Sequence, residues 1–190
     1  MRVDLPTRVA GLIGVPLVWI AVARVDPAAI GLTLRLTASD WALVGVLALG
    51  AALVTLAYRR WYWPVGQAPG RTALVLELPF FLAVNPVAEE LFFRGGVQFG
   101  LANWVGMPWS IAITSVVFGF HHGLLPRWFP FSFLIVGSLG GALFGIVAAM
   151  YQSIAPAIVL HAAADLVIFV AAGPALERLQ VGLRAPAHSR

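Results

Sequence analysis

Long apolar runs alternate with shorter polar segments along the chain. Six runs stand out: Val9–Ala23, Trp41–Tyr58, Ala73–Phe93, Met107–Phe120, Phe131–Tyr151 and Ile154–Ala172. A helix needs about 20 apolar residues, within a range of about 17–25, to cross the hydrocarbon core of a bilayer. The pattern predicts an all-α, polytopic transmembrane helical bundle of about six spans, in which the first and fourth runs borrow flanking residues.

The segments between the runs are expected to be connections. They are Val25–Asp40, Arg59–Thr72, Arg94–Gly106, a bend at Pro126–Pro130 and a tight turn at Gln152-Ser153. We therefore divide the chain into N-terminal spans and loops over 1–72, a core over 73–173 and an aqueous cytoplasmic tail over 174–190. The first run also resembles a cleavable signal peptide, but the later spans do not need one, and we interpret it as a retained anchor.

The composition excludes several classes of protein. Of the 190 residues, 61% are hydrophobic and 11% are charged, against about 45–50% and about 25% in soluble domains, and the mean hydropathy is +0.91. A soluble domain of this size has too much surface to hide so much apolar area. The absence of Cys excludes disulfides and thiolate chemistry, and the absence of Lys excludes Schiff-base and Ser–Lys chemistry.

The arginines set the expected orientation in the membrane. All twelve cationic side chains are Arg, which we interpret as a sign of a G+C-rich bacterial genome. They are scattered between the apolar runs, so the net charge of +4 indicates topology in a lipid bilayer rather than a nucleic-acid partner. With the N-terminus inside, nine Arg face the cytoplasm and three do not, namely Arg24, Arg35 and Arg94. By the positive-inside rule we expect a multi-pass protein of the inner (cytoplasmic) membrane with both termini cytoplasmic.

Three clusters of polar residues interrupt the apolar runs of the core. They are Glu89–Arg94, Phe118–His122 and His161–Asp165. A charged side chain in hydrocarbon costs ~2.5–3.5 kcal/mol on insertion scales, so charges that persist there are functional candidates. Each cluster alone is typical of a structural ion pair, a hydrogen-bonded pair or an interfacial histidine. Their co-occurrence favours a polar, water-filled active-site cavity between the helices.

Residue spacing predicts which of these side chains are neighbours. Glu90 and Arg94 are four residues apart, as are His161 and Asp165, so each pair shares one helix face. Asn85 precedes a Pro and is a candidate helix cap.

Counting from the chain reversals predicts which clusters meet. Glu89 precedes Gly106 by almost the same number of positions as His122 follows it. If the chain reverses near Gly106, both side chains lie ~25 Å from the reversal, towards the cytoplasmic side. His161 lies much nearer to the turn at Ser153, and the same count leaves it about 10 Å shallower unless the helices are staggered.

In chain order the clusters contain Glu-Glu-x-x-x-Arg, Phe-x-x-x-His and His-x-x-x-Asp. Three such motifs on successive membrane helices resemble the CPBP (CAAX protease and bacteriocin-processing, or ABI) family, which includes the Ras-converting CAAX endopeptidases. The resemblance covers Glu89 to Asp165 and implies an intramembrane endopeptidase that cleaves a membrane-associated protein or peptide. The alternative is a non-catalytic membrane protein of the same fold, used in bacteriocin immunity or as a partner subunit. Because every motif position is filled, we favour the enzyme.

The resemblance also implies roles for individual residues. Glu89 and His122 would activate a water molecule, and His161 with Asp165 would form the oxyanion pocket. The supporting residues would be Glu90, Arg94 and Phe118. The second motif selects His122 over His121, because only His122 has a Phe four residues before it.

Asp165 departs from the Asn that is more common in the third motif. An Asn amide can donate a hydrogen bond to an oxyanion, whereas an ionised carboxylate only accepts one. Either burial keeps Asp165 protonated, or Asp165 orients His161 and His161 alone donates. We favour the protonated donor.

A metal-dependent alternative uses the same side chains. Members of the family have been called both metallo- and glutamic peptidases, and a zinc ion would be held by the four catalytic candidates, Glu89, His122, His161 and Asp165. The sequence contains no His-Glu-x-x-His motif. We therefore favour glutamic catalysis without a cofactor, with zinc as the alternative.

A stripe of small residues marks the fifth run. Gly137, Gly141 and Gly145 recur at every fourth residue and allow another backbone to approach closely. We favour tight packing of this face inside one bundle, and a homodimer seam is the alternative.

The predicted topology places the Arg59–Thr72 loop in the cytoplasm, because this loop contains three of the arginines. A reporter that works only in the cytoplasm should therefore be active when it is fused at Gly66, and a reporter that works only in the periplasm should be inactive there. Paired fusions, one reporter for each side of the membrane, measure this directly. A periplasmic Gly66 would contradict the six-span arrangement.

Overall fold

The computed structural model describes residues 9–62, 78–123 and 131–171. In these ranges every regular element is a helix and no strand occurs, which confirms the all-α class. The helices are η1 (Val9–Gly14), α2 (Val15–Ala23), η2 (Pro27–Ile30), α3 (Ala38–Tyr62), η3 (Phe80–Val84), α5 (Asn85–Glu90), η4 (Leu91–Gln98), α6 (Phe99–Val105), α7 (Met107–Gly123), α8 (Ser132–Tyr151), α9 (Ala155–Asp165) and η5 (Leu166–Ala171). By length and composition, α3 and α8 are able to cross a membrane.

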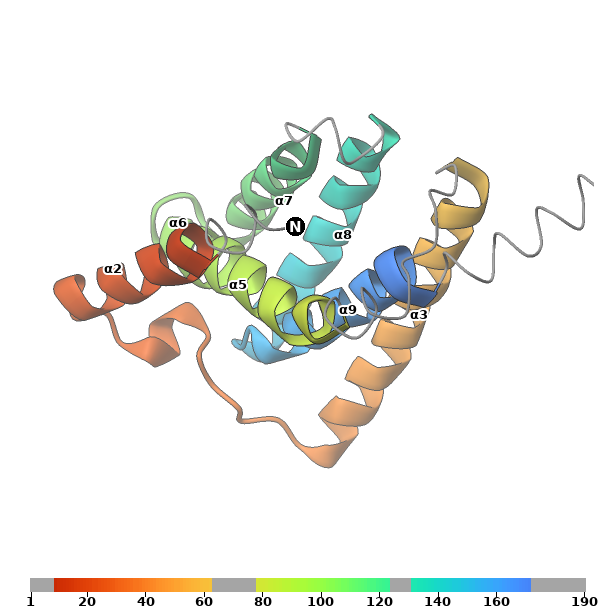
Figure 1. Ribbon diagram of the computed structural model, residues 1–190. Helices are drawn as coiled ribbons and strands as arrows, with labels where there is room; N and C mark the ends of the chain where they lie inside the picture. Colours follow the sequence, from red (N-terminus) through yellow and green to blue (C-terminus); the bar gives the residue numbers. More distant parts are fainter. Residues whose placement is uncertain (1–8, 63–77, 124–130, 172–190) are drawn as a thin grey trace, which may run out of the picture.

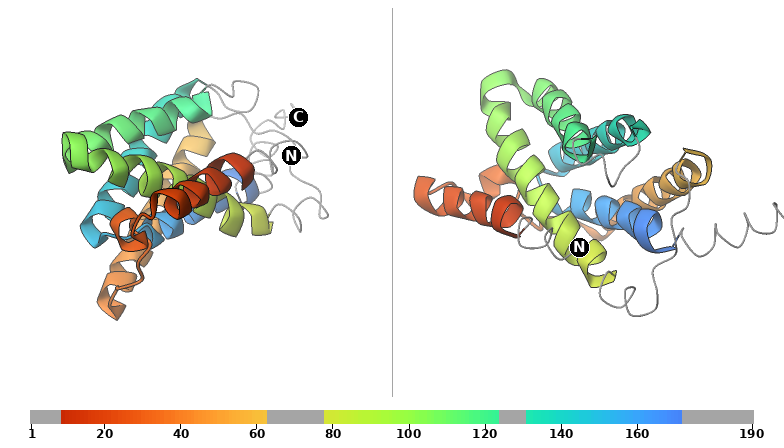
Figure 2. Two further views of the ribbon diagram at one scale, coloured as in Figure 1. Left: turned by 90° about the vertical axis from the view of Figure 1, so that its left-hand side faces the viewer. Right: turned by 45° about the horizontal axis from the view of Figure 1, so that its top comes forward.

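One continuous helical segment crosses the middle of the bundle. It consists of η3, α5, η4 and α6 and runs from Phe80 to Val105. The helices α7 and α8 pack against each other on one flank of this segment, and α9, with α3 beyond it, lies on another flank (Figure 1 and Figure 2). The N-terminal helix α2 lies along the outer side of η4. Every element of the predicted core therefore borders this central segment or its direct neighbours.

Two of the predicted reversals lie within the described residues, and both are confirmed. Gly106 ends α6 with a φ of 79°, a conformation that glycine adopts without a steric cost. Gln152 ends α8 with a φ of 47°. The Pro126–Pro130 bend and most of the Arg59–Thr72 loop lie outside the described residues.

The prediction of a connection at Arg94–Gly106 is wrong. The chain is helical up to Val105, and only Gly106 breaks it. Glycines in this stretch made it resemble a loop, but they serve helix packing: a Cβ built on Gly95 would lie 3.3 Å from the carbonyl oxygen of Ile30. The Ser110 hydroxyl also donates to the backbone oxygen of Gln98, which ties α7 to the end of η4.

The glycine face of α8 is covered by α7 within the same chain. A Cβ built on Gly137 would lie 3.4 Å from the Cα of Gly119, and one built on Gly141 would lie 3.2 Å from the Cα of Ser115. Gly145 lies against Gln98 and Ile111. The three glycines thus bring α8 close to α7 and η4, which is the packing inside one bundle that the small-residue stripe favoured.

The α7–α8 contact predicts that Gly119→Ala destabilises the protein. A Cβ at Gly119 would collide with the Ser138 hydroxyl and lie 2.6 Å from the backbone oxygen of Leu134, and such overpacking typically costs about 1–3 kcal/mol. The matched control is Gly50→Ala in α3, where a Cβ meets nothing within 4 Å. Thermal unfolding in detergent should show a lower midpoint for Gly119→Ala only, and equal midpoints would contradict the close contact.

Candidate active site

The central helical segment, which runs from Phe80 to Val105 and is called the central helix below, buries three charged side chains within two turns. Glu89, Glu90 and Arg94 are each 0% exposed. Glu90 ends α5, and Arg94 lies one turn later in η4. The segment η4 is a π-helix, in which a backbone N–H bonds to the carbonyl five residues earlier. One such bond runs from the Phe99 N–H to the carbonyl of Arg94. Such turns are rare and occur often at functional sites.

Glu90 bridges two cationic or ionisable groups. Its Oε2 lies 3.0 Å from Nε of Arg94, and its Oε1 lies 2.8 Å from Nδ1 of His161 on α9. The guanidinium of Arg94 also lies over the ring of Phe118, with Cζ 4.7 Å from the ring centroid. Glu90 therefore links the central helix to α9 and neutralises part of the buried positive charge.

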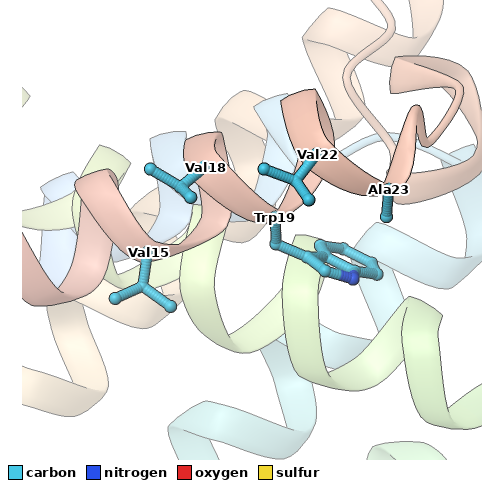
Figure 3. Close-up of a pocket in the computed structure, with 5 residues that line it drawn as sticks. All are labelled: Val15, Val18, Trp19, Val22 and Ala23. Carbon is cyan, nitrogen blue, oxygen red and sulfur yellow. The ribbon is translucent and has the colours of Figure 1, made fainter.

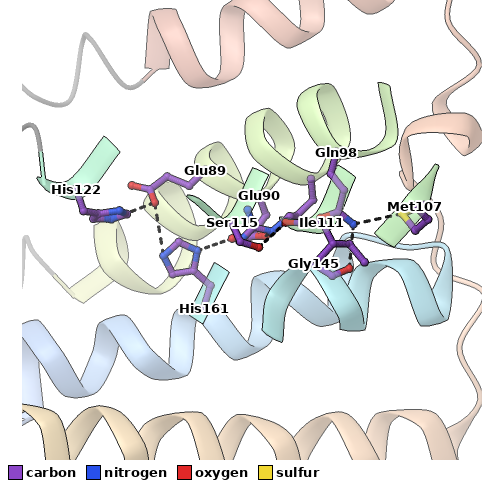
Figure 4. A network of polar contacts seen from close by, with 10 residues as sticks. Glu89, Glu90, Gln98, Met107, Ile111, Ser115, His122, Gly145 and His161 are labelled. Atoms are coloured by element: carbon purple, nitrogen blue, oxygen red, sulfur yellow. Dashed lines mark hydrogen bonds and ion pairs between the residues drawn. The ribbon is translucent and has the colours of Figure 1, made fainter. Parts of the chain in front are cut away.

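Glu89 points to the other side of this cluster, toward two histidines (Figure 4). Its Oε2 lies 3.5 Å from Nε2 of His122 and 3.7 Å from Nε2 of His161. His122 and His161 are 6% and 3% exposed. The structure thus brings Glu89, His122 and His161 together from three different helices.

The hydrogen bonds of His122 define which of its nitrogens faces Glu89. Nδ1 lies 2.9 Å from the backbone oxygen of Phe118, one turn earlier in α7. A carbonyl only accepts, so Nδ1 carries the hydrogen. In the neutral ring, Nε2 is then an acceptor, and it faces an oxygen of Glu89 that is also an acceptor. A water molecule placed beside both atoms would donate one hydrogen bond to each of them.

His161 is oriented in the same way, but by a side chain. Its Nδ1 donates to Glu90, so its Nε2 points to Glu89 and to Oδ1 of Asp165, which is 3.6 Å away. That separation is longer than a hydrogen bond. Glu90, rather than Asp165, is therefore the residue that holds the His161 ring in place.

The sequence context of Asn85 predicted a helix cap, and this prediction is wrong. Asn85 is instead a member of the polar cluster. The helix continues through it without a side-chain cap, and its Nδ2 donates to Oδ2 of Asp165 over 2.7 Å. The spacing held a usable signal, because Asn85 lies one turn before Glu89 on the same helix face.

Aromatic rings surround the polar cluster. The ring of Phe144 stacks on His161 with centroids 5.1 Å apart and planes 19° apart. The Phe118 ring lies 4.7 Å from the ring of His122 and 5.6 Å from that of His161, between centroids. Phe118 thus contacts all three cationic or ionisable partners of the glutamates. The role of Phe144 had no signal in the sequence.

The depth of His161, which residue counting left too shallow, follows from the position of α9. The turn before α9 is held on the segment after η2, where the Ile154 N–H donates to the carbonyl of Gly31 over 2.9 Å. A Cβ on Gly31 would meet the Phe99 ring as well as Ile154, so the turn lies near Phe99 rather than Gly106. From there α9 runs antiparallel to α5, and the pairs Asn85–Asp165 and Glu90–His161 set its register.

A separate apolar hollow lies on the surface of α2 (Figure 3). Its lining shares no residue with the polar cluster and consists of Val15, Val18, Trp19, Val22 and Ala23. Within the described ranges, no group of three or more His and acidic side chains is arranged to hold a metal ion.

The double contact of Glu90 predicts a large stability effect for Glu90→Gln. The substitution removes the charge that faces both Arg94 and His161, and breaking a buried pair typically costs about 3–5 kcal/mol. Asp26→Asn removes an acidic charge at an exposed position and is the matched control. Chemical unfolding in detergent should separate the two variants by several kcal/mol. Equal stability would show that the bridge contributes little.

Comparison with known proteins gives one family. A family model described as type II CAAX prenyl endopeptidase Rce1-like matches residues 71–167, just over half of the chain. Searches of curated proteins and of solved structures gave no match. The matched range contains all three polar motifs and every side chain of the cluster described above. The chain belongs to the Rce1-like family of type II CAAX prenyl endopeptidases.

Proposed function

We propose that this protein is an intramembrane endopeptidase that hydrolyses a peptide bond of a membrane-associated protein or peptide with a water activated by Glu89 and His122. The observation that carries the proposal is the 3.5 Å approach of Glu89 Oε2 to His122 Nε2. Two acceptors that face each other at this distance suit a water molecule, which donates one hydrogen to each. Membership of a protease family supports the same chemistry.

The first step is attack of this water on the scissile carbonyl carbon. Glu89, whose carboxylate is completely buried at the cluster, accepts the proton as the new C–O bond forms. His122 holds the water through its Nε2 lone pair. The proton is then delivered to the leaving nitrogen as the C–N bond breaks, which returns Glu89 to its starting state.

The oxyanion of the tetrahedral intermediate needs hydrogen-bond donors. Asp165 supplies one from Oδ1 in its protonated form, and His161 supplies another from Nε2 when both of its nitrogens carry hydrogen. Two carboxylates lie beside His161, Glu90 at 2.8 Å from Nδ1 and Glu89 at 3.7 Å from Nε2, and they favour that charged ring. Removal of one such donor typically lowers kcat by about 10²–10³.

We place the protein in the bacterial inner membrane as a six-span bundle with cytoplasmic termini. Large apolar side chains cover the outer face of α3, including Val46 at 67% and Val54 at 66% exposure. Exposed aromatic residues mark the two ends of the bundle, as expected at membrane–water interfaces: Trp104 and Trp109 at the Gly106 end, and Trp61, Tyr62 and Phe131 at the end that carries Arg59 and Arg60. His122 lies at the latter end of α7, so the active site lies near the cytoplasmic side.

Glu89→Gln should abolish cleavage, because it removes the base and keeps the shape of the side chain. Cleavage of a membrane-anchored reporter peptide in proteoliposomes measures the rate, and Asp26→Asn serves as the charge-matched control. His122→Asn should be similarly inactive, whereas His121→Asn should stay active. A Glu89→Gln variant with wild-type activity would overturn the mechanism.

Two further outcomes of this assay would select another interpretation. Strong inhibition by a chelator, reversed by zinc, would replace the glutamic mechanism by the metal-dependent one. Absence of any Glu89-dependent cleavage, both in proteoliposomes and in membrane proteomes compared between a knockout strain and one carrying Glu89→Ala, would favour a non-catalytic member of the family.

A further inference from the structure

Asn85 occupies a position in the cluster to which the proposed reaction assigns no role. It is 4% exposed, and its partner Asp165 is 6% exposed. Its Nδ2 donates to Oδ2 of Asp165 over 2.7 Å. The other carboxyl oxygen, Oδ1, is the one directed at His161, 3.6 Å from Nε2. The two oxygens of Asp165 therefore have different neighbours.

This asymmetry determines where Asp165 can carry a proton. The amide nitrogen of Asn85 is only a donor, so Oδ2 of Asp165 must accept. Because the carbonyl-type oxygen of a carboxyl group is the better acceptor, a protonated Asp165 then carries its hydrogen on Oδ1, the oxygen directed at His161. Without the amide, the carboxyl group is able to rotate by half a turn and place an acceptor there instead.

We propose that Asn85 is a positioning residue that fixes which atom of residue 165 faces the substrate. The inference rests on the proposed endopeptidase function and deepens it. It applies equally to the Asp165→Asn variant: the side-chain oxygen of the new amide accepts from Asn85, and its NH₂ group faces the oxyanion. With either Asp or Asn at position 165, Asn85 therefore orients that residue so that its donor group faces the site.

A purely structural role for Asn85 makes a different prediction. The Asn85–Asp165 pair lies on the same two helices as Glu89 and His161, one turn from each on its helix. It therefore also stabilises the contact between α5 and α9. In that role only the presence of a hydrogen bond matters, and its direction is irrelevant.

Exchange of the two side chains separates these roles. In the double variant Asn85→Asp with Asp165→Asn, the hydrogen bond re-forms in the reverse direction, from the NH₂ of residue 165 to the carboxylate at 85. The oxygen of residue 165 then faces the substrate, and it can only accept. The exchange keeps the pair, its volume and its composition, and it reverses the group that the site presents.

The experiment compares four proteins in proteoliposomes with one membrane-anchored reporter peptide whose cleavage requires Glu89. They are the wild type, Asp165→Asn, the exchanged double variant and Asn103→Asp, a control that makes the same substitution at an exposed position of α6. Initial rates over a range of peptide concentrations give kcat and KM. Thermal midpoints in detergent report folding.

We expect Asp165→Asn to cleave the peptide at a measurable fraction of the wild-type kcat. The double variant should have a kcat lower than that of Asp165→Asn by about 10²-fold or more, the loss of one oxyanion donor. Its KM should change little, and its thermal midpoint should match that of Asp165→Asn. Asn103→Asp should behave as the wild type.

Two results would overturn the proposal. One is a double variant that cleaves as fast as Asp165→Asn, because the direction of the bond would then not matter. The other is an inactive but folded Asp165→Asn protein, because its amide would then not act as the presented donor. Failure of the endopeptidase function itself is distinguishable, since the wild type would then show no Glu89-dependent cleavage at all.

Discussion

The buried bridge from Arg94 through Glu90 to His161 is the interaction on which the rest of the cluster depends. Its two contacts are 3.0 Å and 2.8 Å long, and the carboxylate and guanidinium are completely buried. Neither charge is stable alone in an apolar bundle, because an unpaired buried ion costs several kcal/mol. Together they fix the position of α9 against the central helix and the orientation of the His161 ring. The bridge thereby holds Nε2 of His161 on the side of Glu89.

That arrangement also requires very close helix packing on the opposite flank. Gly119, Gly137 and Gly141 let α7 and α8 approach with almost no side chain between them. This approach places Phe118 and His122 of α7 over Arg94 and Glu89 of the central helix. In a membrane, where lipid is as apolar as the helix surface, small residues and polar contacts are the main source of such specific packing. The glycines and the charged cluster thus both determine how the helices pack around the central segment.

Much of this could be predicted from the sequence, where the determining interactions are local. Hydrophobic run lengths located the helices, and Gly106 and Gln152-Ser153 marked the reversals that the structure shows. The predictions were wrong where contacts between distant parts of the chain determine the local structure or the position of a side chain. Arg94–Val105 has the glycines of a loop but is helical, because those glycines pack against Ile30 and other neighbours. His161 lies deeper than counting allowed, because the turn before α9 is held by Gly31. Asn85 has the sequence context of a cap, and only the register of α9 shows its partner.

The pair of acceptors at Glu89 and His122 has a consequence for the design of inhibitors. If the proposed water lies there, a head group that replaces it needs two hydrogen-bond donors on one atom, since a ketone or an ester would place a third acceptor between two others. The hydrate of an aldehyde or an activated ketone meets this requirement, because one carbon carries two hydroxyl groups. The neighbouring rings of Phe118 and Phe144 are 3% and 4% exposed, so they leave little room beside this head group. An inhibitor of the proposed reaction should therefore present a geminal diol with small substituents at the carbon that carries it.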